Sequence, residues 1–419
     1  MSILLAVAAT AFVVLLVANL SSSEKKIEHE IHPLYGAGDE QFRRSMGVLL
    51  GPAILPGNRV TALRNGREIF PAMLHAIRTA ERTITFETYI YWSGEIGREF
   101  AEALSARARA GVAVHVLLDW VGTGKMDDEL LEGMKEAGVE VLKYHPLRWY
   151  SLGRINNRTH RKLLIVDGTT GFTGGVGIAD EWLGDAEDAA HWRDSHYRVE
   201  GPVVAQMQAA FMDNWMKTRS LVLHGEEYFP SLAPVGEHAA QVFTSSATDG
   251  SESVRLMYLL SIASARSSIR LSASYFVPDG LAVATMLAAR ERGVSVEIVV
   301  PGGHIDAKVT RKASKGLWGP LLEAGVRIYE FQPTMYHCKV MIVDDVWVSV
   351  GSTNFDNRSF RLNDEANLNV LDPDFAAEQA RTFEADKERS REITLAMWQA
   401  RPWREKLKER LAGLVRSQL

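Results

Sequence analysis

Apolar and polar positions follow two rhythms that alternate along this chain. Residues 70–80 and 96–110 carry apolar side chains at helical spacing, and the second segment ends at Gly111, a residue typical of helix C-termini. Residues 83–92 and 112–119 are rich in β-branched and aromatic residues, which predicts strands. Helices that alternate with strands are typical of βαβ units, so the pattern predicts a mainly parallel sheet covered by helices.

The same order of elements returns in the second part of the chain. Residues 265–300 repeat the strand, helix, strand order of residues 80–119, and an Ala-Gly-Val sequence precedes a predicted strand in both parts, at residues 137–139 and 324–326. We therefore predict an α/β protein made of two similar halves related by a pseudo-twofold axis. Further helices are expected over residues 128–137, 202–217 and 373–391, and a further strand over 139–144.

A His-x-Lys-x4-Asp motif occurs twice, at positions 177 residues apart. In both copies an apolar run separates Lys from Asp, as in a buried strand. Residues i and i+2 of a strand face the same side, so His and Lys of each copy should point into one shared cleft. Two imidazoles and two ammonium groups suit an anion that needs a nucleophile and a proton donor. The motif residues are His160, Lys162 and Asp167 in the first copy, and His337, Lys339 and Asp344 in the second.

The N-terminal segment, residues 3–20, is apolar and uncharged. Its length is just sufficient to span a bilayer as one helix. A cleaved signal peptide is the alternative, but no Lys or Arg precedes the apolar run and no clear small-x-small site follows it. We predict an uncleaved anchor, whose orientation the two lysines at positions 25 and 26 leave open.

Composition narrows the function further. The formal net charge of −5 argues against nucleic acid as the main partner, which usually needs a basic face. The single cysteine, Cys338, excludes an intramolecular disulfide and a thiolate metal cluster. It lies between His337 and Lys339, so on a strand it should point away from them. We interpret it as a small buried residue rather than a catalytic thiol.

The double motif resembles the phospholipase D superfamily. Residues 87–92, 111–119 and 350–356 are similar to the bacterial cardiolipin synthase branch, and the resemblance covers roughly residues 55 to 419. It implies the phospholipase D fold, preceded here by one transmembrane helix, with no cofactor or metal and a location at the bacterial inner membrane. The expected division is an anchor at 1–22, a linker and lead-in at 23–58, a first half at 59–238, a second half at 239–395, and a C-terminal amphipathic helix at 396–419.

A phosphodiester is negatively charged, so a neutral imidazole attacks it more readily than an anionic nucleophile does. One histidine would form a phosphohistidine intermediate while the other protonates the leaving alcohol. The residues alone favour neither assignment, whereas the resemblance implies His160 as the nucleophile and His337 as the acid and base. Lys162 and Lys339 would neutralise the non-bridging oxygens as charge builds.

Each histidine also needs a carboxylate that fixes its tautomer. The resemblance implies Asp194 and Glu365, which follow the motifs at matching places in the two halves. Ser352 and Asn354 could donate hydrogen bonds to the phosphate. The first half has glycine at the corresponding positions, 175 and 177, so the halves should be chemically unequal.

Four further groups of residues have more than one interpretation. Asp167 and Asp344 belong to the motif, but they fall at strand ends where an aspartate can hold turn amides, so we interpret both as structural. The aromatic residues of 89–92 and 275–276 line either an acyl or glycerol pocket or a core. The basic, apolar-spaced segment 398–419 lies either on anionic lipid or against the second half with a solvated basic face. Arg148, Arg154, Arg158 and Arg161 form a basic cluster before the first motif that either meets lipid phosphates or is solvated.

These observations predict a membrane-bound phosphatidyltransferase of the cardiolipin synthase type. Its partners would be phosphatidylglycerol, an anionic phospholipid, and an alcohol acceptor, with no nucleic acid. A phospholipase D hydrolase that forms phosphatidic acid is the alternative, because water can intercept the same intermediate. A nuclease is less consistent with the negative net charge. A non-catalytic membrane scaffold is less consistent with two intact motifs.

Overall fold

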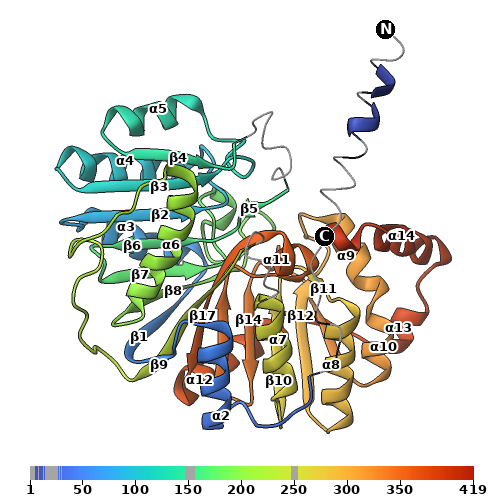
Figure 1. Cartoon of the computed structure of the whole chain (residues 1–419). Coiled ribbons are helices and arrows are strands. Elements are labelled where there is room, and N and C mark those ends of the chain that lie inside the picture. Colours follow the sequence, from blue (N-terminus) through green and yellow to red (C-terminus); the bar gives the residue numbers. More distant parts are fainter. Residues whose placement is uncertain are drawn as a thin grey trace.

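The computed structural model contains two α/β halves side by side, with strands β1 and β9 between them (Figure 1). It describes residues 31–146, 156–246 and 253–419, together with positions 5–7, 9–12, 14, 27 and 29. We call the elements β1 to α6 the first half and the elements β9 to β18 the second half. Each half contributes one wing of a continuous sheet that β1 and β9 join.

The first half runs from residue 55 to residue 219. Its elements are β1 (Leu55–Arg64), α3 (Asn65–Arg78), β2 (Thr83–Thr88), α4 (Glu95–Arg109), β3 (Ala113–Asp119), α5 (Asp128–Glu136), β4 (Glu140–Tyr144), β5 (Arg158–Thr159), β6 (Leu163–Val166), β7 (Thr170–Gly174), η3 (Asp180–Trp182), β8 (Ser195–Glu200) and α6 (Val204–Arg219).

The second half begins at residue 238, and three short helical elements follow it. Its elements are β9 (His238–Ser245), α7 (Ser253–Ala263), β10 (Ser268–Ala273), β11 (Phe276–Val277), α8 (Gly280–Glu291), β12 (Ser295–Pro301), α9 (Lys308–Gly316), α10 (Trp318–Glu323), β13 (Arg327–Phe331), β14 (Lys339–Val343), β15 (Trp347–Gly351), β16 (Phe355–Asp356), α11 (Asn357–Arg361), β17 (Asn363–Leu371), α12 (Pro373–Glu388) and β18 (Ser390–Ile393), followed by α13 (Leu395–Gln399), α14 (Trp403–Gly413) and η4 (Arg416–Gln418).

The internal repeat is visible in the order of the strands. The first half has the order β8-β7-β6-β2-β3-β4, and the second half has the equivalent order β17-β15-β14-β10-β12-β13. The motif strands β6 and β14 pair with β2 and β10 in equivalent registers, Ile84 opposite Val166 and Ile269 opposite Val343.

The prediction of a mainly parallel sheet was wrong. Within each half, helical crossovers make parallel pairs of the β2, β3 and β4 type, but the motif strand β6 is antiparallel to both of its neighbours, β2 and β7, and β7 is antiparallel to β8. The prediction of βαβ units rested on the helical segments. The tight turn after each motif strand contains no helix, so the sequence pattern did not indicate that the next strand is antiparallel. The sheet is therefore mixed.

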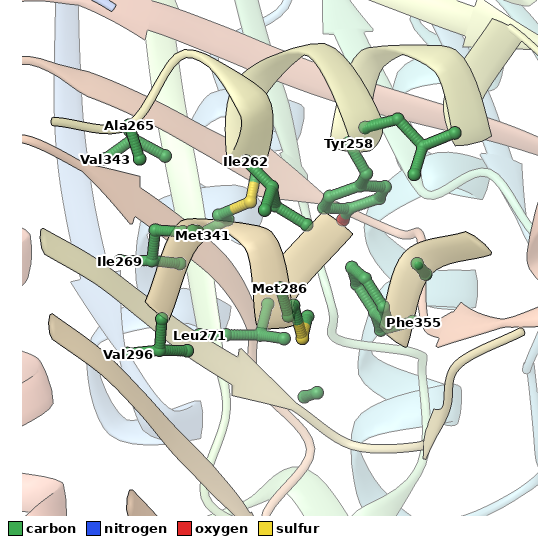
Figure 2. Close-up of a cluster of buried hydrophobic side chains, with 14 of the residues drawn as sticks. Tyr258, Ile262, Ala265, Ile269, Leu271, Met286, Val296, Met341, Val343 and Phe355 are labelled. Atoms are coloured by element: carbon green, nitrogen blue, oxygen red, sulfur yellow. The ribbon is translucent and has the colours of Figure 1, made fainter. Parts of the chain in front are cut away.

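Apolar side chains from helices and strands form one core in each half, and a third core is built from residues of both halves. In the second half, residues of α7 and α8 such as Ile262 and Met286 pack onto Leu271 and Met341 of the sheet (Figure 2). Burial of apolar surface of this kind contributes about 25 cal/mol per Å². These cores hold the interior strands near whose ends the site residues lie.

The lead-in before β1 is packed and is not a simple linker. Helix α2 (Glu40–Ser45) and the π-helical turn η1 (Met46–Leu50) place Phe42, Met46 and Leu50 in the core of the second half. The Phe42 ring lies edge-on to Trp347, with ring centroids 5.0 Å apart. Mixed charge, Gly and Pro hid this role, because the three apolar residues recur at helical spacing over less than three turns.

The predicted membrane anchor, residues 3–20, lies mostly outside the described residues. Among the residues that the structure describes, no helix is both long enough and apolar enough to cross a bilayer.

Candidate active site

The two motif histidines are held where the halves meet. The backbone N–H of His160 donates to the carbonyl of Asp364, 2.8 Å away, and the N–H of His337 donates to the carbonyl of Arg193, also 2.8 Å away. Each motif is thus attached to the opposite half. His160 and Lys162 precede β6 rather than lying on it, whereas Lys339 is the first residue of β14.

The orienting carboxylates are exchanged between the halves. Glu365 lies 2.9 Å from Nδ1 of His160, and Asp194 lies 2.7 Å from Nδ1 of His337. Sequence order suggested one carboxylate for the histidine of its own half. The structure pairs them crosswise because β8 and β17 both begin at the junction, each beside the other half's motif. This leaves Nε2 of His160 to meet a substrate, whereas Nε2 of His337 also lies 3.3 Å from Lys339 Nζ.

Each carboxylate is fixed by further donors. Ser352 Oγ lies 2.5 Å from Glu365, and Trp182 Nε1 and the Ser195 N–H donate to Asp194 at 2.9 and 2.8 Å. Burial acts to raise the pKa of both carboxyls, but the facing histidines and these hydrogen bonds hold each pKa below its usual value. Both groups are therefore anionic at neutral pH and select the tautomer with the proton on Nδ1.

Both motif lysines are buried beside their histidines. Lys162 Nζ donates to the carbonyl of His160 at 2.8 Å, and Lys339 Nζ donates to the carbonyl of His337 at 2.7 Å and to Ser274 Oγ at 2.6 Å. Burial lowers the pKa of Lys162 to about 7, and the charge of Lys339 adds to this effect while Glu365 opposes it. The two motifs therefore share one electrostatic environment.

The histidines themselves favour the neutral form. Burial lowers the pKa of His160 to about 4, against the opposing charge of Glu365. Burial and the Lys339 ammonium likewise lower the pKa of His337. A bound phosphodiester anion would stabilise the protonated form of either ring and raise its pKa.

The loops after the motif strands differ between the halves, as the sequence predicts. Ser352 contacts Glu365 rather than facing a substrate, which differs from its expected role as a phosphate donor. Asn354 is almost fully buried, and its Oδ1, an acceptor, has no hydrogen-bond partner; its expected role as a phosphate donor stays a prediction. At Gly175 a Cβ would lie 2.2 Å from Asp194, so this glycine makes room for the carboxylate.

The motif aspartates lie at the ends of β6 and β14 and hold backbone amides. Asp167 accepts from the N–H groups of residues 81–83 at 2.7 to 2.9 Å, and Asp344 accepts from those of residues 266–268 at 2.7 to 3.0 Å. These amides precede or begin β2 and β10. These contacts agree with the interpretation of both aspartates as structural residues. They give neither aspartate a catalytic role.

Aromatic rings border both histidines. Tyr89 meets the His160 ring edge-on with centroids 5.2 Å apart, and Trp182 and Trp192 pack on His337 at 5.3 and 5.5 Å. Sequence reasoning missed Trp182, which belongs to no motif, and did not single out Trp192, although it lies two residues before Asp194. Of the other aromatic candidates, Tyr91 and Phe276 are core residues, Trp92 donates to the carbonyl of Gly122, and Tyr275 donates to Asp306.

Two other candidate features prove structural. Cys338 is buried against Ser195 and Arg193, and burial raises the pKa of its thiol to about 12. Arg161 is fully buried and donates to Ala210 and Asp213, so it does not face lipid. Arg148 and Arg154 of the basic cluster lie outside the described residues, and Arg158 packs against the Trp120 ring.

Comparison with known proteins gives this geometry its context. The family model described as cardiolipin synthase, PLD-like domain, matches residues 73–215 and 258–387, and each matched segment contains one motif. The chain belongs to the cardiolipin synthase family. It is 34% identical over 377 residues to cardiolipin synthase 1 of Bacillus anthracis, covering 87% of this chain and 73% of the relative.

A second relative supports this membership over most of the chain. Cardiolipin synthase A of Pseudomonas syringae pv. syringae is 34% identical over 354 residues, which cover 84% of this chain and 73% of the relative. The crystal structure of phosphatidylserine synthase from Haemophilus influenzae Rd KW20 has the same fold at a TM-score of 0.67, with 14% identity, covering 86% of this chain and 95% of that one. Within the described residues of this cardiolipin synthase family member, no group of three or more His, Cys, Asp or Glu side chains is arranged to hold a metal ion.

Proposed function

We propose that this protein transfers a phosphatidyl group from one phosphatidylglycerol to the free hydroxyl of another, and so forms cardiolipin and glycerol. The supporting observation is the crosswise pairing of His160 with Glu365 and of His337 with Asp194, in a chain of the cardiolipin synthase family. Two imidazoles with fixed tautomers, flanked by two lysines, supply what a two-step phosphoryl transfer requires.

In the first step, Nε2 of His160 attacks phosphorus, and the bond from phosphorus to the glycerol oxygen breaks. His337 donates its proton to that oxygen, and glycerol leaves. The low pKa of His160, about 4, suits the nucleophile because the ring is neutral at physiological pH. The 2.7 Å contact between His337 and Asp194 suits the acid, because the carboxylate stabilises the protonated ring.

In the second step, the hydroxyl of another phosphatidylglycerol gives its proton to His337 while its oxygen attacks phosphorus. The bond from phosphorus to His160 breaks, and cardiolipin is released. Lys162, Lys339 and the amide of Asn354 would bind the non-bridging oxygens in both transition states. Asp167 and Asp344 take no part, and act through the strand ends they hold.

We also propose that residues 3–20 anchor the protein to the bacterial inner membrane, because they are apolar and carry no charge. The anchor would keep the site at the surface from which phosphatidylglycerol is drawn. Alkaline extraction of membranes that contain the full chain or a chain lacking residues 1–22 tests this: the full chain should stay with the lipid.

Product analysis tests the reaction. The full chain, reconstituted with phosphatidylglycerol, should release one glycerol for each cardiolipin formed. Phosphatidic acid without cardiolipin would overturn the transferase proposal and indicate that water is the acceptor.

A second assay separates the two histidines. A phosphatidyl ester of p-nitrophenol needs no acid for its leaving group, so the His337→Ala protein should release one equivalent of p-nitrophenol rapidly and then stall. His160→Ala should give no such burst. The reverse pattern would exchange the two roles.

A further inference from the structure

Helix α14 turns its apolar side away from the protein. Trp403, Leu407, Leu411 and Leu414 lie four, four and three residues apart, so they form one stripe along the helix. Their exposed fractions are 69, 47, 57 and 79%. We call these four residues the apolar stripe.

The opposite side of the helix is the one that contacts the protein. Glu409 and Ala412 are buried there, and Glu409 forms an ion pair of 3.1 Å with Arg401. Helix α14 packs alongside α9 in this orientation (Figure 1). A surface helix normally buries its apolar stripe and exposes its charges. In α14 the side that contains Glu409 is buried and the side that contains the leucines is exposed. The leucines therefore do not contribute to the core of the protein.

Charge around the apolar stripe points to an anionic partner. Between residues 401 and 416 there are six Lys or Arg residues and two Glu residues, in a chain whose formal net charge is −5. Lys406 and Arg410 lie on one side of the stripe, and Arg404 and Lys408 lie on the other, by helical spacing. The neighbouring helix α9 adds exposed Lys308, Val309 and Lys312 and contains no acidic residue. An apolar stripe between two rows of cations matches the interface of an anionic bilayer, with acyl chains below and phosphates beside them.

The residues that follow α14 connect it to elements near the active site. The Leu419 carbonyl accepts from the N–H of Arg358 in α11, 3.0 Å away. Burial raises the pKa of Tyr89, the ring that packs on His160, and the nearby Arg358 charge opposes this rise. On the other side, Asp306 in the loop before α9 accepts from Tyr275, next to the Ser274 that contacts Lys339.

We propose that the apolar stripe of α14, with the cations of α9 and α14 around it, inserts into the surface of an anionic bilayer. The insertion would hold the entrance of the active site against the headgroups. The proposal deepens the proposed function, on which its purpose depends, but the contact itself can be observed whether or not the protein makes cardiolipin.

Site-specific quenching tests the contact in the full chain. Because the native Cys338 is buried, a fluorophore can be attached to Leu411→Cys, with Leu221→Cys as a control at an exposed leucine in the other half. In phosphatidylglycerol bilayers, nitroxide-labelled lipids should quench the label at 411 at least twofold more than the label at 221, and aqueous iodide should do the reverse. Equal quenching at both positions would overturn the proposal. So would a label at 411 that is shielded from both quenchers, since that result would mean that protein covers the stripe.

The anionic component has its own test. Charge reversal of Lys408 and Arg410 to Glu should weaken lipid quenching at position 411, about fivefold in apparent affinity for each charge removed. Bilayers of phosphatidylcholine should give the same loss with the unaltered helix. Unchanged quenching in both cases would overturn the role of charge.

Turnover separates this inference from the proposed function. The triple variant Trp403→Ser, Leu407→Ser, Leu411→Ser should lose at least tenfold of its cardiolipin formation in bilayers and keep its rate on monomeric short-chain phosphatidylglycerol. A triple serine variant at Leu221, Val222 and Val235, which are also exposed, should keep both rates. Equal rates of the two variants in bilayers would overturn the inference. Absence of cardiolipin from any substrate, with lipid quenching at 411 intact, would overturn the proposed function alone.

Discussion

Glu365 and His160 are 205 positions apart and belong to different halves, yet the carboxylate lies 2.9 Å from Nδ1 of the imidazole. The reciprocal contact joins Asp194 to His337 at 2.7 Å. Neither half could therefore orient its own histidine. A fused pair of halves supplies both carboxylates in one chain, and the reaction needs both halves to be docked.

Glu365→Gln should lower kcat by about 10²–10⁴-fold with little change in KM, because the amide no longer selects the tautomer and no longer stabilises the charged ring. The intermediate forms on His160, so the variant should also lose the p-nitrophenol burst. Asp194→Asn should lower turnover of phosphatidylglycerol similarly but keep the burst, since its partner His337 is not needed for that leaving group. If Asp194→Asn lost the burst while Glu365→Gln kept it, the crosswise assignment would be contradicted.

Binding of the substrate anion should weaken as pH rises through neutrality. Burial lowers the pKa of Lys162 to about 7, so its ammonium group is progressively lost above that pH. A phosphonate analogue of phosphatidylglycerol keeps one charge over this range, so its inhibition constant reports the protein alone. We expect the constant to rise by up to about tenfold per pH unit above pH 7.

Lys162→Arg is the matched control for this pH dependence, because a guanidinium group stays charged. Its inhibition constant should change less between pH 7 and pH 9. A residual slope would belong to Lys339, whose pKa burial also lowers. An identical slope in the Arg variant and the unaltered protein would exclude Lys162 as its source.

The sequence repeat was sufficient to predict two similar α/β halves, because the motif and the preceding strand, helix, strand order recur in step. It also predicted that His160 and His337 meet in one site, a prediction with which the effect of the Lys339 charge on the pKa of Lys162 agrees. The crosswise pairing of Asp194 and Glu365 was not predictable in this way. Each lies downstream of one motif, and spacing along the chain does not tell which half's histidine it will face.

Other parts of the site had no sequence signal of their own. Trp182 reaches Asp194 from η3, a three-residue turn outside any repeat. Ser352 sits where a phosphate donor was expected, but its hydroxyl donates a hydrogen bond to Glu365. Such choices depend on side-chain packing at the junction of the halves, which neither spacing nor periodicity records.

The motif aspartate should matter for stability and not for chemistry. Asp167→Asn keeps one acceptor oxygen but loses another, which leaves one of the amides of residues 81–83 unpaired. We expect a loss of about 1–3 kcal/mol in the free energy of unfolding, with kcat per folded molecule unchanged. Urea unfolding and a burst titration of active sites measure the two quantities. Asp344→Asn should behave in the same way. A large fall in kcat in a protein whose active sites all titrate in the burst would show that the aspartate has a catalytic role.

Stability should also depend on pH through Glu87, which is buried behind the first motif. One of its oxygens contacts Asn214 Nδ2 at 2.7 Å and also Thr159, the residue before His160, while the other oxygen has no hydrogen-bond partner. Burial raises the pKa of Glu87 to about 7, against the opposing charge of Arg161. The folded protein therefore holds a proton there that the unfolded chain releases near pH 4.5.

A raised carboxyl pKa contributes stability that is complete below the unfolded value and is lost as pH rises through the folded value. At Glu87 this loss amounts to about 3 kcal/mol between pH 4.5 and pH 8. Glu87→Gln keeps the acceptor for Asn214 and cannot ionise, so its stability relative to the unaltered protein should rise by up to that amount over the same range. Urea unfolding at intervals of one pH unit measures the difference, with the exposed Glu129→Gln as a control that should follow the unaltered protein. Parallel curves for Glu87→Gln and the unaltered protein would show that Glu87 is already ionised in the folded state, and that Arg161 compensates its burial.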